Sequence, residues 1–339
     1  MTYVKYLICH DCEMFLQLII MLLGFLLLVK GADFLVKGGS DIAKKFHIPE
    51  LVIGLTIVSI GTSLPELMVS VTAALEGHSD LSIGNVIGSN ISNLLLILGL
   101  CSIIRNLKFK NETKYFESPF AIIVTILLFV LANNNLMGQP NMITRAEGFI
   151  LLSLCIIFII YNIIMSKKGE EFDGISKDLV FIDTKMSSSR FVIKAILFII
   201  IGSIFLKFGG DFVVNSSTKI ARILGMSEKL ISLTIISIAT SLPELITSMI
   251  AAKRGEIDLA IGNIIGSCIF NILLIIGTSA LISPINYSTS YNKDMVILII
   301  ATVLLGLFPF IGKKNEMTKA NGILFFGGYI AYMAFLIIQ

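Results

Sequence analysis

Long apolar runs recur along the whole chain and are separated by short polar stretches. A run of about 18 or more apolar residues is long enough to cross the hydrocarbon core of a bilayer as a helix. The pattern therefore predicts an all-α polytopic membrane protein with ten transmembrane helices. The ten predicted spans are residues 14–36, 50–75, 80–104, 117–134, 144–166, 191–215, 229–252, 258–282, 294–312 and 318–338.

The composition agrees with a chain that lies mostly within lipid. Hydrophobic residues make up 55% of the chain and charged residues 14%, whereas soluble domains carry roughly 25% charged residues. The net charge of +3 is small and is spread over several loops, so no nucleic-acid partner is expected. The five cysteines are scattered and lack the spacing of a disulfide framework. The role of Cys9 and Cys12, which form an isolated C-x-x-C pair, stays open.

The two halves of the chain repeat each other. Sliding the sequence so that Glu66 falls on Glu244 aligns residues 54–99 with 232–277 without a gap, and well over half of these positions are identical. Five spans per half is an odd number, so the second half must enter the membrane from the opposite side. This is the inverted-repeat design of secondary transporters. The predicted division is an N-terminal tail at 1–13, a first five-helix repeat at 14–166, a cytoplasmic linker at 167–190 and a second repeat at 191–339.

The distribution of Lys and Arg predicts how the chain is oriented. With the N-terminus outside, most basic residues fall in the loops that are then cytoplasmic. The basic loop 216–229 is the exception, since it is predicted to lie outside. The linker 167–190 is too short for a folded domain, so no soluble regulatory domain is expected. We predict a plasma-membrane protein with both termini extracellular.

A six-residue motif with a carboxylate occurs inside one predicted span of each half. Residues 61–66 read Gly-Thr-Ser-Leu-Pro-Glu and residues 239–244 read Ala-Thr-Ser-Leu-Pro-Glu. Proline in a helix interior leaves the carbonyl four residues earlier without its usual donor. Such carbonyls, and a carboxylate, are tolerated at membrane depth only where they face protein, water or an ion. The motif supplies oxygen ligands without His or Cys, which suits a hard cation such as Ca²⁺ better than zinc or copper.

A second repeated motif follows each of these spans. Residues 84–93 and 262–271 share the pattern Gly-Asn-x-Ile-Gly-Ser followed four residues later by Asn. The Ser and the last Asn of each copy are four residues apart and share one helix face. The glycines form small-xxx-small surfaces that allow close helix packing. A lone Ser or Thr in a membrane helix usually bonds its own backbone, so the carboxylates Glu66 and Glu244 carry the functional hypothesis.

With these motifs the chain resembles the sodium/calcium exchanger family of the cation/calcium exchanger superfamily, in its prokaryotic type without a regulatory domain. The two motifs resemble the α-repeats of that family, and the resemblance covers both halves in the right order. In the family, the broken second and seventh helices and the third and eighth helices surround a central cation site.

The resemblance implies a set of ion-binding residues. The two glutamates would bind both ions, two threonine carbonyls would join them on Ca²⁺, and serines would join them on Na⁺. Two asparagines would line the middle of the site, and two further serine carbonyls would contribute. In that order the residues are Glu66 and Glu244; Thr62 and Thr240; Ser63, Ser241, Ser89 and Ser267; Asn93 and Asn271; Ser59 and Ser237.

One position departs from part of the family. Some prokaryotic members and the potassium-dependent branch have Asp where this chain has Asn271. An amide there leaves two formal negative charges in the site and argues against K⁺ cotransport. The proton/calcium branch resembles the chain less, because its motif usually carries an acidic residue at the place of Gly88 or Ser89.

The resemblance implies an antiporter that exchanges Na⁺ for Ca²⁺ by alternating access, is electrogenic and independent of K⁺, and uses no cofactor. A H⁺/Ca²⁺ antiporter and a K⁺-dependent Na⁺/Ca²⁺ antiporter are the transport alternatives, and a cation channel is an alternative of another class. An enzyme is not expected, since His10, His47 and His78 all lie outside the predicted spans. A monomer is the simplest expectation, although the sequence leaves the oligomeric state open.

Overall fold

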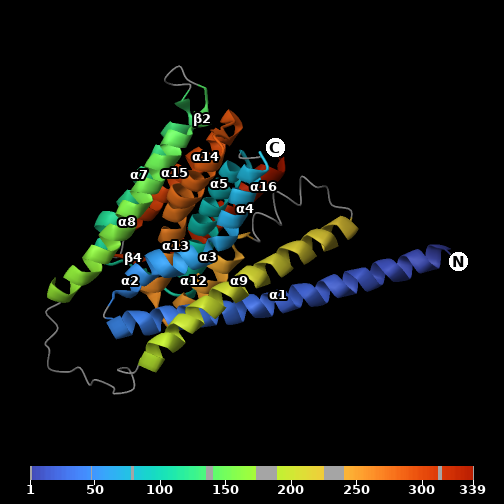
Figure 1. Cartoon of the computed structure of the whole chain (residues 1–339), viewed down its shortest axis with the longest axis horizontal. Coiled ribbons are helices and arrows are strands. Elements are labelled where there is room, and N and C mark those ends of the chain that lie inside the picture. Colours follow the sequence, from blue (N-terminus) through green and yellow to red (C-terminus); the bar gives the residue numbers. More distant parts are fainter. Residues whose placement is uncertain are drawn as a thin grey trace.

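The computed structural model describes residues 2–46, 48–77, 80–134, 140–172, 189–224, 240–311 and 315–338, and these are almost entirely helical (Figure 1). The expected all-α architecture is therefore confirmed. The helices of the first half are α1 (Thr2–Phe46), α2 (Glu50–Ile53), η1 (Gly54–Val58), α3 (Ser59–Thr62), α4 (Leu64–Leu75), α5 (Asp80–Ile91), η2 (Ser92–Leu98), α6 (Gly99–Ile104), η3 (Thr113–Glu117), α7 (Ser118–Ala132) and α8 (Arg145–Phe172).

The second half repeats much of this order. Its described helices are α9 (Ser189–Ile223), α12 (Leu242–Arg254), α13 (Ile257–Phe270), η6 (Asn271–Ile276), α14 (Gly277–Ile282), η7 (Thr289–Tyr291), α15 (Asn292–Leu307), η8 (Phe308–Phe310) and α16 (Lys319–Ile338). Two short antiparallel strand pairs join the halves. In them β1 (Leu107–Lys108) pairs with β4 (Glu316–Met317), and β2 (Met142–Ile143) pairs with β3 (Ile285–Asn286).

Among the described residues, seven helices are long and apolar enough to span a membrane, or eight if the bent pair Glu50–Thr62 and Leu64–Leu75 is one span. Two of the ten predicted spans are not among them. The stretch 229–252 begins outside the described residues, and only its later part is seen, as α12. The stretch 318–338 forms α16, which is not one of the seven helices that are long and apolar enough to span a membrane. The count of ten therefore stays a prediction.

Helix α1 is longer than the sequence pattern suggested. It runs without interruption from Thr2 to Phe46, so the stretch predicted as a tail is helical and the helix continues beyond the predicted span 14–36. Helical propensity does not stop where hydrophobicity stops, and this segment contains no proline to end the helix. The division of the chain at residue 13 remains a prediction about the membrane boundary, which the backbone does not mark.

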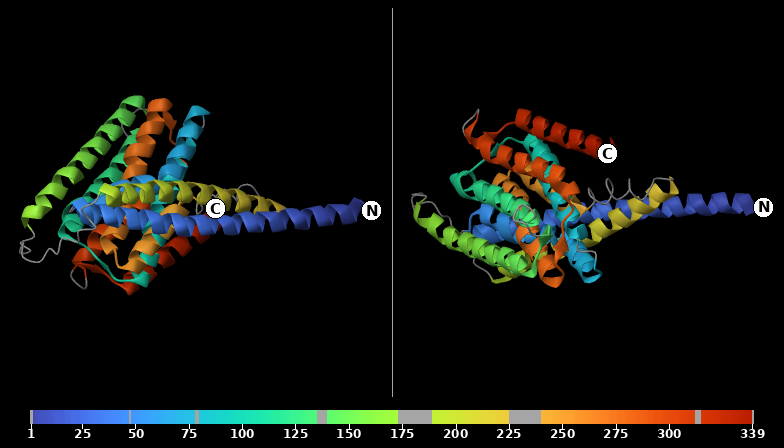
Figure 2. Two further views of the ribbon diagram at one scale, coloured as in Figure 1. Left: turned by 60° about the horizontal axis from the view of Figure 1, so that its bottom comes forward. Right: turned by 90° about the horizontal axis from the view of Figure 1, so that it is seen from above.

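Helices α1 and α9 lie side by side and outside the rest of the bundle (Figures 1 and 2). The two helices are antiparallel, and they contact each other through small residues that recur every seven positions in each helix. Gly24 meets Gly209, Gly31 meets Gly202, and Gly38 meets Ala195. A Cβ atom on Gly31 would lie only 2.8 Å from the Gly202 carbonyl oxygen. The small size of the residues at these positions therefore lets the two backbones touch directly.

The buried centre of the fold is formed by other helices. Of the most apolar stretch of Ile257–Ile282, 94% is buried, and for Leu81–Ile104 the share is 72%. The corresponding shares are 33% for Glu13–Phe46, which contains most of α1, and 17% for Phe191–Ile223 in α9. Helix α13 packs directly against α2, η1, α3 and η2. The two repeated motifs thus lie at the centre, and the α1–α9 pair lies at the edge.

Candidate ion-binding site

Each described motif contains the same backbone break. Ser63 ends α3 with φ −83° and ψ 7°, and Ser241 precedes α12 with φ −85° and ψ 5°. Pro65 and Pro243 occupy the first turn of the helix that follows, where a missing N–H is tolerated. In the first half the axis turns by 49° at this point. The predicted proline break is therefore present and takes nearly the same form in both halves.

The break places a carboxylate in the first turn of a new helix in each half. Glu66 lies in the first turn of α4 and Glu244 in the first turn of α12, and each side chain is only 1% exposed. A helix N-terminus favours negative charge, because its backbone N–H groups and dipole point toward the carboxylate. The two carboxylates interact electrostatically with each other. Ser63 Oγ donates a hydrogen bond of 2.8 Å to Glu244 Oε1, so the first motif contacts the glutamate of the second.

The second motif of each half ends in a π-helical segment. In the first half η2 starts at Ser92, next to Asn93, and in the second half η6 starts at Asn271 itself. The extra residue in each π-helical turn changes the direction of the side chains, and such segments are frequent at functional sites. Ser89, Asn93, Ser267 and Asn271 are all buried beside the two breaks.

The site contains an unusual number of buried polar atoms that make no hydrogen bond with any described residue. Native folds leave few such atoms, because each costs the free energy of lost hydration. Nearly all predicted ligand side chains contribute to the set. The atoms are both Glu66 carboxylate oxygens, Glu244 Oε2, Ser89 Oγ, Ser241 Oγ, Ser267 Oγ, Asn271 Oδ1, and Oδ1 and Nδ2 of Asn93. Most are oxygens, which is the ligand type that Na⁺ and Ca²⁺ require.

The remaining predicted residues fall into two groups. Thr62, Thr240 and Ser59 are buried beside the same breaks. Thr62 Oγ1 donates to the Ser59 carbonyl at 3.2 Å and to Asn263 Oδ1 at 3.1 Å, so its hydroxyl already has protein partners. That Thr62 acts through its carbonyl stays a prediction. Ser237 lies outside the described residues.

Sequence reasoning missed the residues that hold the motifs in place. Asn85 Nδ2 donates to the Glu66 carbonyl at 3.3 Å and to Ser70 Oγ at 3.1 Å. In the second half Asn263 Nδ2 donates to Ser248 Oγ at 2.8 Å, while its Oδ1 accepts from Thr62. The signal was available, because both asparagines belong to the repeated Gly-Asn pair. Each one ties the glutamate-bearing helix to the helix that follows it.

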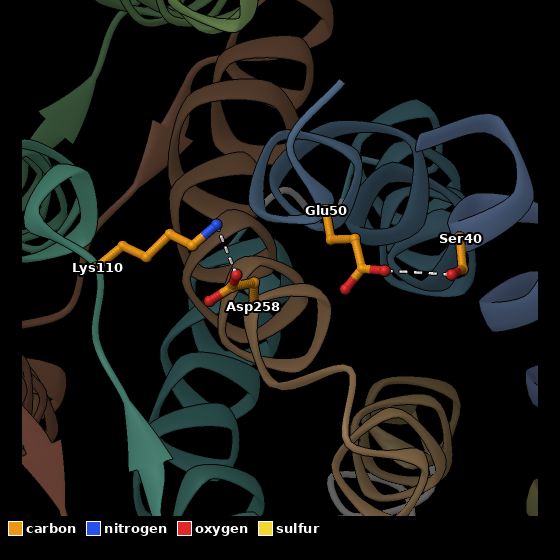
Figure 3. A network of polar contacts seen from close by, with 4 residues as sticks. All are labelled: Ser40, Glu50, Lys110 and Asp258. Atoms are coloured by element: carbon orange, nitrogen blue, oxygen red, sulfur yellow. Dashed lines mark hydrogen bonds and ion pairs between the residues drawn. The ribbon is translucent and has the colours of Figure 1, made fainter. Parts of the chain in front are cut away.

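Polar contacts at one end of these helices join peripheral segments to the centre (Figure 3). Ser40 Oγ of α1 donates to Glu50 Oε1 of α2 at 3.2 Å, and Lys110 Nζ pairs with Asp258 Oδ2 of α13 at 2.8 Å. Glu256, in the turn between α12 and α13, is half-buried near this cluster. Burial raises the pKa of its carboxyl above the usual value, and the neighbouring Glu50 carboxylate adds to that rise.

Membrane-length helices around two buried, oxygen-rich helix breaks define the chain as an integral membrane cation transporter. The family model for sodium/calcium exchanger protein matches residues 16–164 and 194–338, which is most of the sequence. The chain therefore belongs to the sodium/calcium exchanger family, as its motifs predicted. Members of this family are secondary transporters that exchange cations across a membrane, with Na⁺ and Ca²⁺ as the transported ions.

Relatives and solved structures agree with this assignment. The chain is 36% identical to CaxA of Alkalimonas amylolytica over 95% of its length and 99% of that protein. It is 30% identical to the sodium/calcium exchanger MaX1 of Methanosarcina acetivorans, over 94% of this chain and 97% of the relative. The solved structure of the sodium-calcium exchanger NCX_Mj soaked without Na⁺ and Ca²⁺ superposes with a TM-score of 0.80 and 31% identity, covering 95% of this chain and 99% of the other.

Proposed function

We propose that this chain exchanges Na⁺ for Ca²⁺ across the plasma membrane by alternating access, without a requirement for K⁺. The observation that carries the proposal is the pair of buried glutamates, Glu66 and Glu244, which come from the two halves, with Ser63 of the first motif donating a hydrogen bond to Glu244 of the second. The names of MaX1 and NCX_Mj as sodium/calcium exchangers support the choice of Na⁺ as the counter-ion.

The charge of the site explains why the two ions would compete. Two carboxylates neutralise one Ca²⁺, and the same oxygens together with serine hydroxyls would hold Na⁺ ions instead. An occupied site is close to neutral, whereas an empty one leaves two carboxylates buried in low dielectric. Occupied states would therefore change their access more readily than the empty state, which couples the two fluxes. Exchange of more than two Na⁺ for each Ca²⁺ moves net charge, and we propose electrogenic transport.

The twelve residues predicted from the motifs form the proposed site. Ca²⁺ would be bound by Glu66, Glu244 and the carbonyls of Thr62 and Thr240. Na⁺ would use the same glutamates with serine hydroxyls and carbonyls, and the two asparagines would line the middle. The neutral amide of Asn271 supports K⁺ independence, because the site then holds two formal charges. The additional positions are Ser63, Ser241, Ser89, Ser267, Asn93, Ser59 and Ser237.

Helices α1 and α9 are proposed as the moving gates of a ten-helix inverted repeat, with both termini extracellular. They are much less buried than the central spans Leu81–Ile104 and Ile257–Ile282, and small residues lie where their backbones meet. The centre, by contrast, is fastened by hydrogen bonds between side chains. A gate that slides past a fixed site needs weakly directional contacts on the gate and directional hydrogen bonds at the site. The contacts of α1 and α9 and those of the centre differ in this way.

Uptake of ⁴⁵Ca²⁺ into Na⁺-loaded proteoliposomes tests the proposal, with K⁺-loaded and pH-gradient vesicles alongside. Uptake should require the outward Na⁺ gradient and be lost at least tenfold in Glu66→Gln and in Glu244→Gln, because each removes one of two charges that balance Ca²⁺. Glu117→Gln is the matched control, since Glu117 is also buried but lies outside both motifs. Uptake driven by the pH gradient alone would contradict Na⁺ coupling, and uptake equal to wild type in both glutamate variants would contradict the site.

A further inference from the structure

A chain of three residues connects the two halves beside the ion site. Asn90 Nδ2 donates to the backbone carbonyl of Cys268 at 3.1 Å, and Asn271 Nδ2 donates to Asn90 Oδ1 at 2.9 Å. Asn90 is fully buried and Asn271 is 1% exposed, so water does not compete for these bonds. Asn90 belongs to α5 in the first half, and both of its partners belong to the second half.

The backbone carbonyl of Cys268 fixes the direction of both hydrogen bonds in this series. A backbone carbonyl can only accept, so the group of Asn90 that faces Cys268 has to be the NH₂. The amide oxygen of Asn90 then faces Asn271, and position 271 has to supply a donor. Asn271 supplies it with its own NH₂, which leaves Asn271 Oδ1 without a hydrogen-bond partner among the described residues.

The corresponding arrangement in the other half is different. The repeat places Cys268 at the position equivalent to Asn90, and Asn93 at the position equivalent to Asn271. Asn93 lies beside the thiol of Cys268, and its amide makes no hydrogen bond with an oxygen or nitrogen atom of a described residue. A thiol is a weak donor and a weak acceptor, so it does not impose a direction on its neighbour. The amide of Asn271 is therefore held in one orientation by Asn90, whereas the amide of Asn93 is able to take either orientation.

We propose that Asn90 determines the specificity of the ion site by requiring an amide, and rejecting a carboxylate, at position 271. A carboxylate there would place an oxygen against Asn90 Oδ1, and Asn90 is unable to turn over without directing its oxygen at the Cys268 carbonyl. Asn90 is a positioning residue, because it acts on the ion through Asn271. The inference depends on the proposed ion site, but not on which ion drives Ca²⁺ exchange.

A double-mutant cycle tests this role with four proteins: wild type, Asn90→Cys, Asn271→Asp and the double variant. The cysteine substitution uses the residue that the chain itself has at the equivalent position, Cys268, and its thiol is able to donate to a carboxylate. We measure equilibrium ⁴⁵Ca²⁺ binding in detergent. Asn90→Cys should weaken binding about threefold in the wild-type background, because Asn271 loses its acceptor. In the Asn271→Asp background the same substitution should tighten binding about tenfold.

We expect Asn90→Cys to change the Ca²⁺ affinity in opposite directions in the two backgrounds. If it changed the affinity by the same factor in both, within about twofold, the proposal would be overturned. Melting temperatures of the four proteins, measured without Ca²⁺, give the same cycle independently of ion binding. Asn271→Asp should lower the melting temperature more in the wild-type background than in the Asn90→Cys background. Equal decreases in melting temperature would also overturn the proposal. Asn162→Cys is the control, since Asn162 is buried and, among the described residues, its side chain bonds the Phe158 carbonyl of its own helix. A wild-type protein that binds no Ca²⁺ would contradict the proposed function, while the melting cycle would still decide the role of Asn90.

Discussion

The α1–α9 pair and the central motif helices are both tightly packed, but they are held by different forces. Between α1 and α9 the backbones touch through glycines, and the outer faces present large apolar side chains such as Phe15, Leu22 and Leu26. At the centre, side chains from both halves are joined by directed hydrogen bonds, of which Ser63 to Glu244 is one. Smooth van der Waals contact can be displaced along the helix axis, whereas a network of hydrogen bonds has one favoured arrangement.

This difference matches the two tasks that we propose for these regions. A cation site needs oxygens held in fixed positions, because binding strength depends on their geometry. A moving element needs a surface on which neighbouring positions have similar energies. Substitutions that damage one task and spare the other therefore test the comparison directly.

The largest effect is expected from Gly31→Leu in α1. The first atom of the new side chain would lie within 2.9 Å of Leu206 N and 2.8 Å of the Gly202 carbonyl oxygen, and backbone atoms are unable to move aside cheaply. We expect α1 and α9 to separate, with a loss of more than tenfold in the exchange rate in proteoliposomes. Ca²⁺ affinity of the folded protein in detergent should change less than threefold, because the site lies in other helices.

Gly327→Leu in α16 is the matched control for this substitution. No described atom lies within 4 Å of a Cβ at Gly327, so the same change of residue should leave exchange close to wild type. If Gly31→Leu exchanged at the wild-type rate, the close contact of α1 and α9 would have no part in transport.

A smaller effect is expected from Ser63→Ala at the centre, and it should appear in ion affinity, which Gly31→Leu leaves nearly unchanged. The substitution removes the donor to Glu244 Oε1 and one proposed Na⁺ ligand. Ca²⁺ and Na⁺ affinities should fall about tenfold, because Glu244 is no longer held in place. A hydrogen bond to a charged group contributes about 1.5–3 kcal/mol to stability, so the melting temperature without ions should fall as well. Isothermal binding measurements decide the outcome. Ser153→Ala is the control, because within the described part of the chain the Ser153 hydroxyl bonds the Phe149 carbonyl of its own helix. Equal losses in both variants would contradict a specific role for Ser63.

The smallest effect is expected at Glu256, near the contacts that join α1 to the centre. Burial, together with Glu50, raises the pKa of its carboxyl in the folded protein. The stability that this group contributes is therefore fully present below the ordinary carboxyl pKa and is lost as pH rises through the raised folded pKa. Glu256→Gln should remove this part of the pH dependence and shift the melting temperature by only a few degrees at neutral pH. Melting curves from pH 4 to pH 8 measure it, and identical pH profiles for variant and wild type would contradict the assignment.

Much of the proposed site followed from the sequence, because its residues occur twice. The buried carboxylates, the prolines and the Gly-Asn pairs stand out as repeated positions inside apolar runs, and the described structure places Ser63 against Glu244 and Asn271 against Asn90. Lipid tolerates polar groups only where they have a purpose or a partner, so the physical chemistry of the membrane made these positions visible.

Only the tertiary structure decided how the two halves meet. Asn90 has no repeated counterpart, so no pattern marked it, and its bond to Asn271 depends on how α5 lies against the second half. The donation from Ser63 to Glu244 crosses between the repeats in the same way. The extent of α1 was also missed, since hydrophobicity marks the lipid boundary rather than the end of a helix. A sequence records which residues are unusual for their surroundings, whereas the pairing of distant residues is determined by packing in three dimensions.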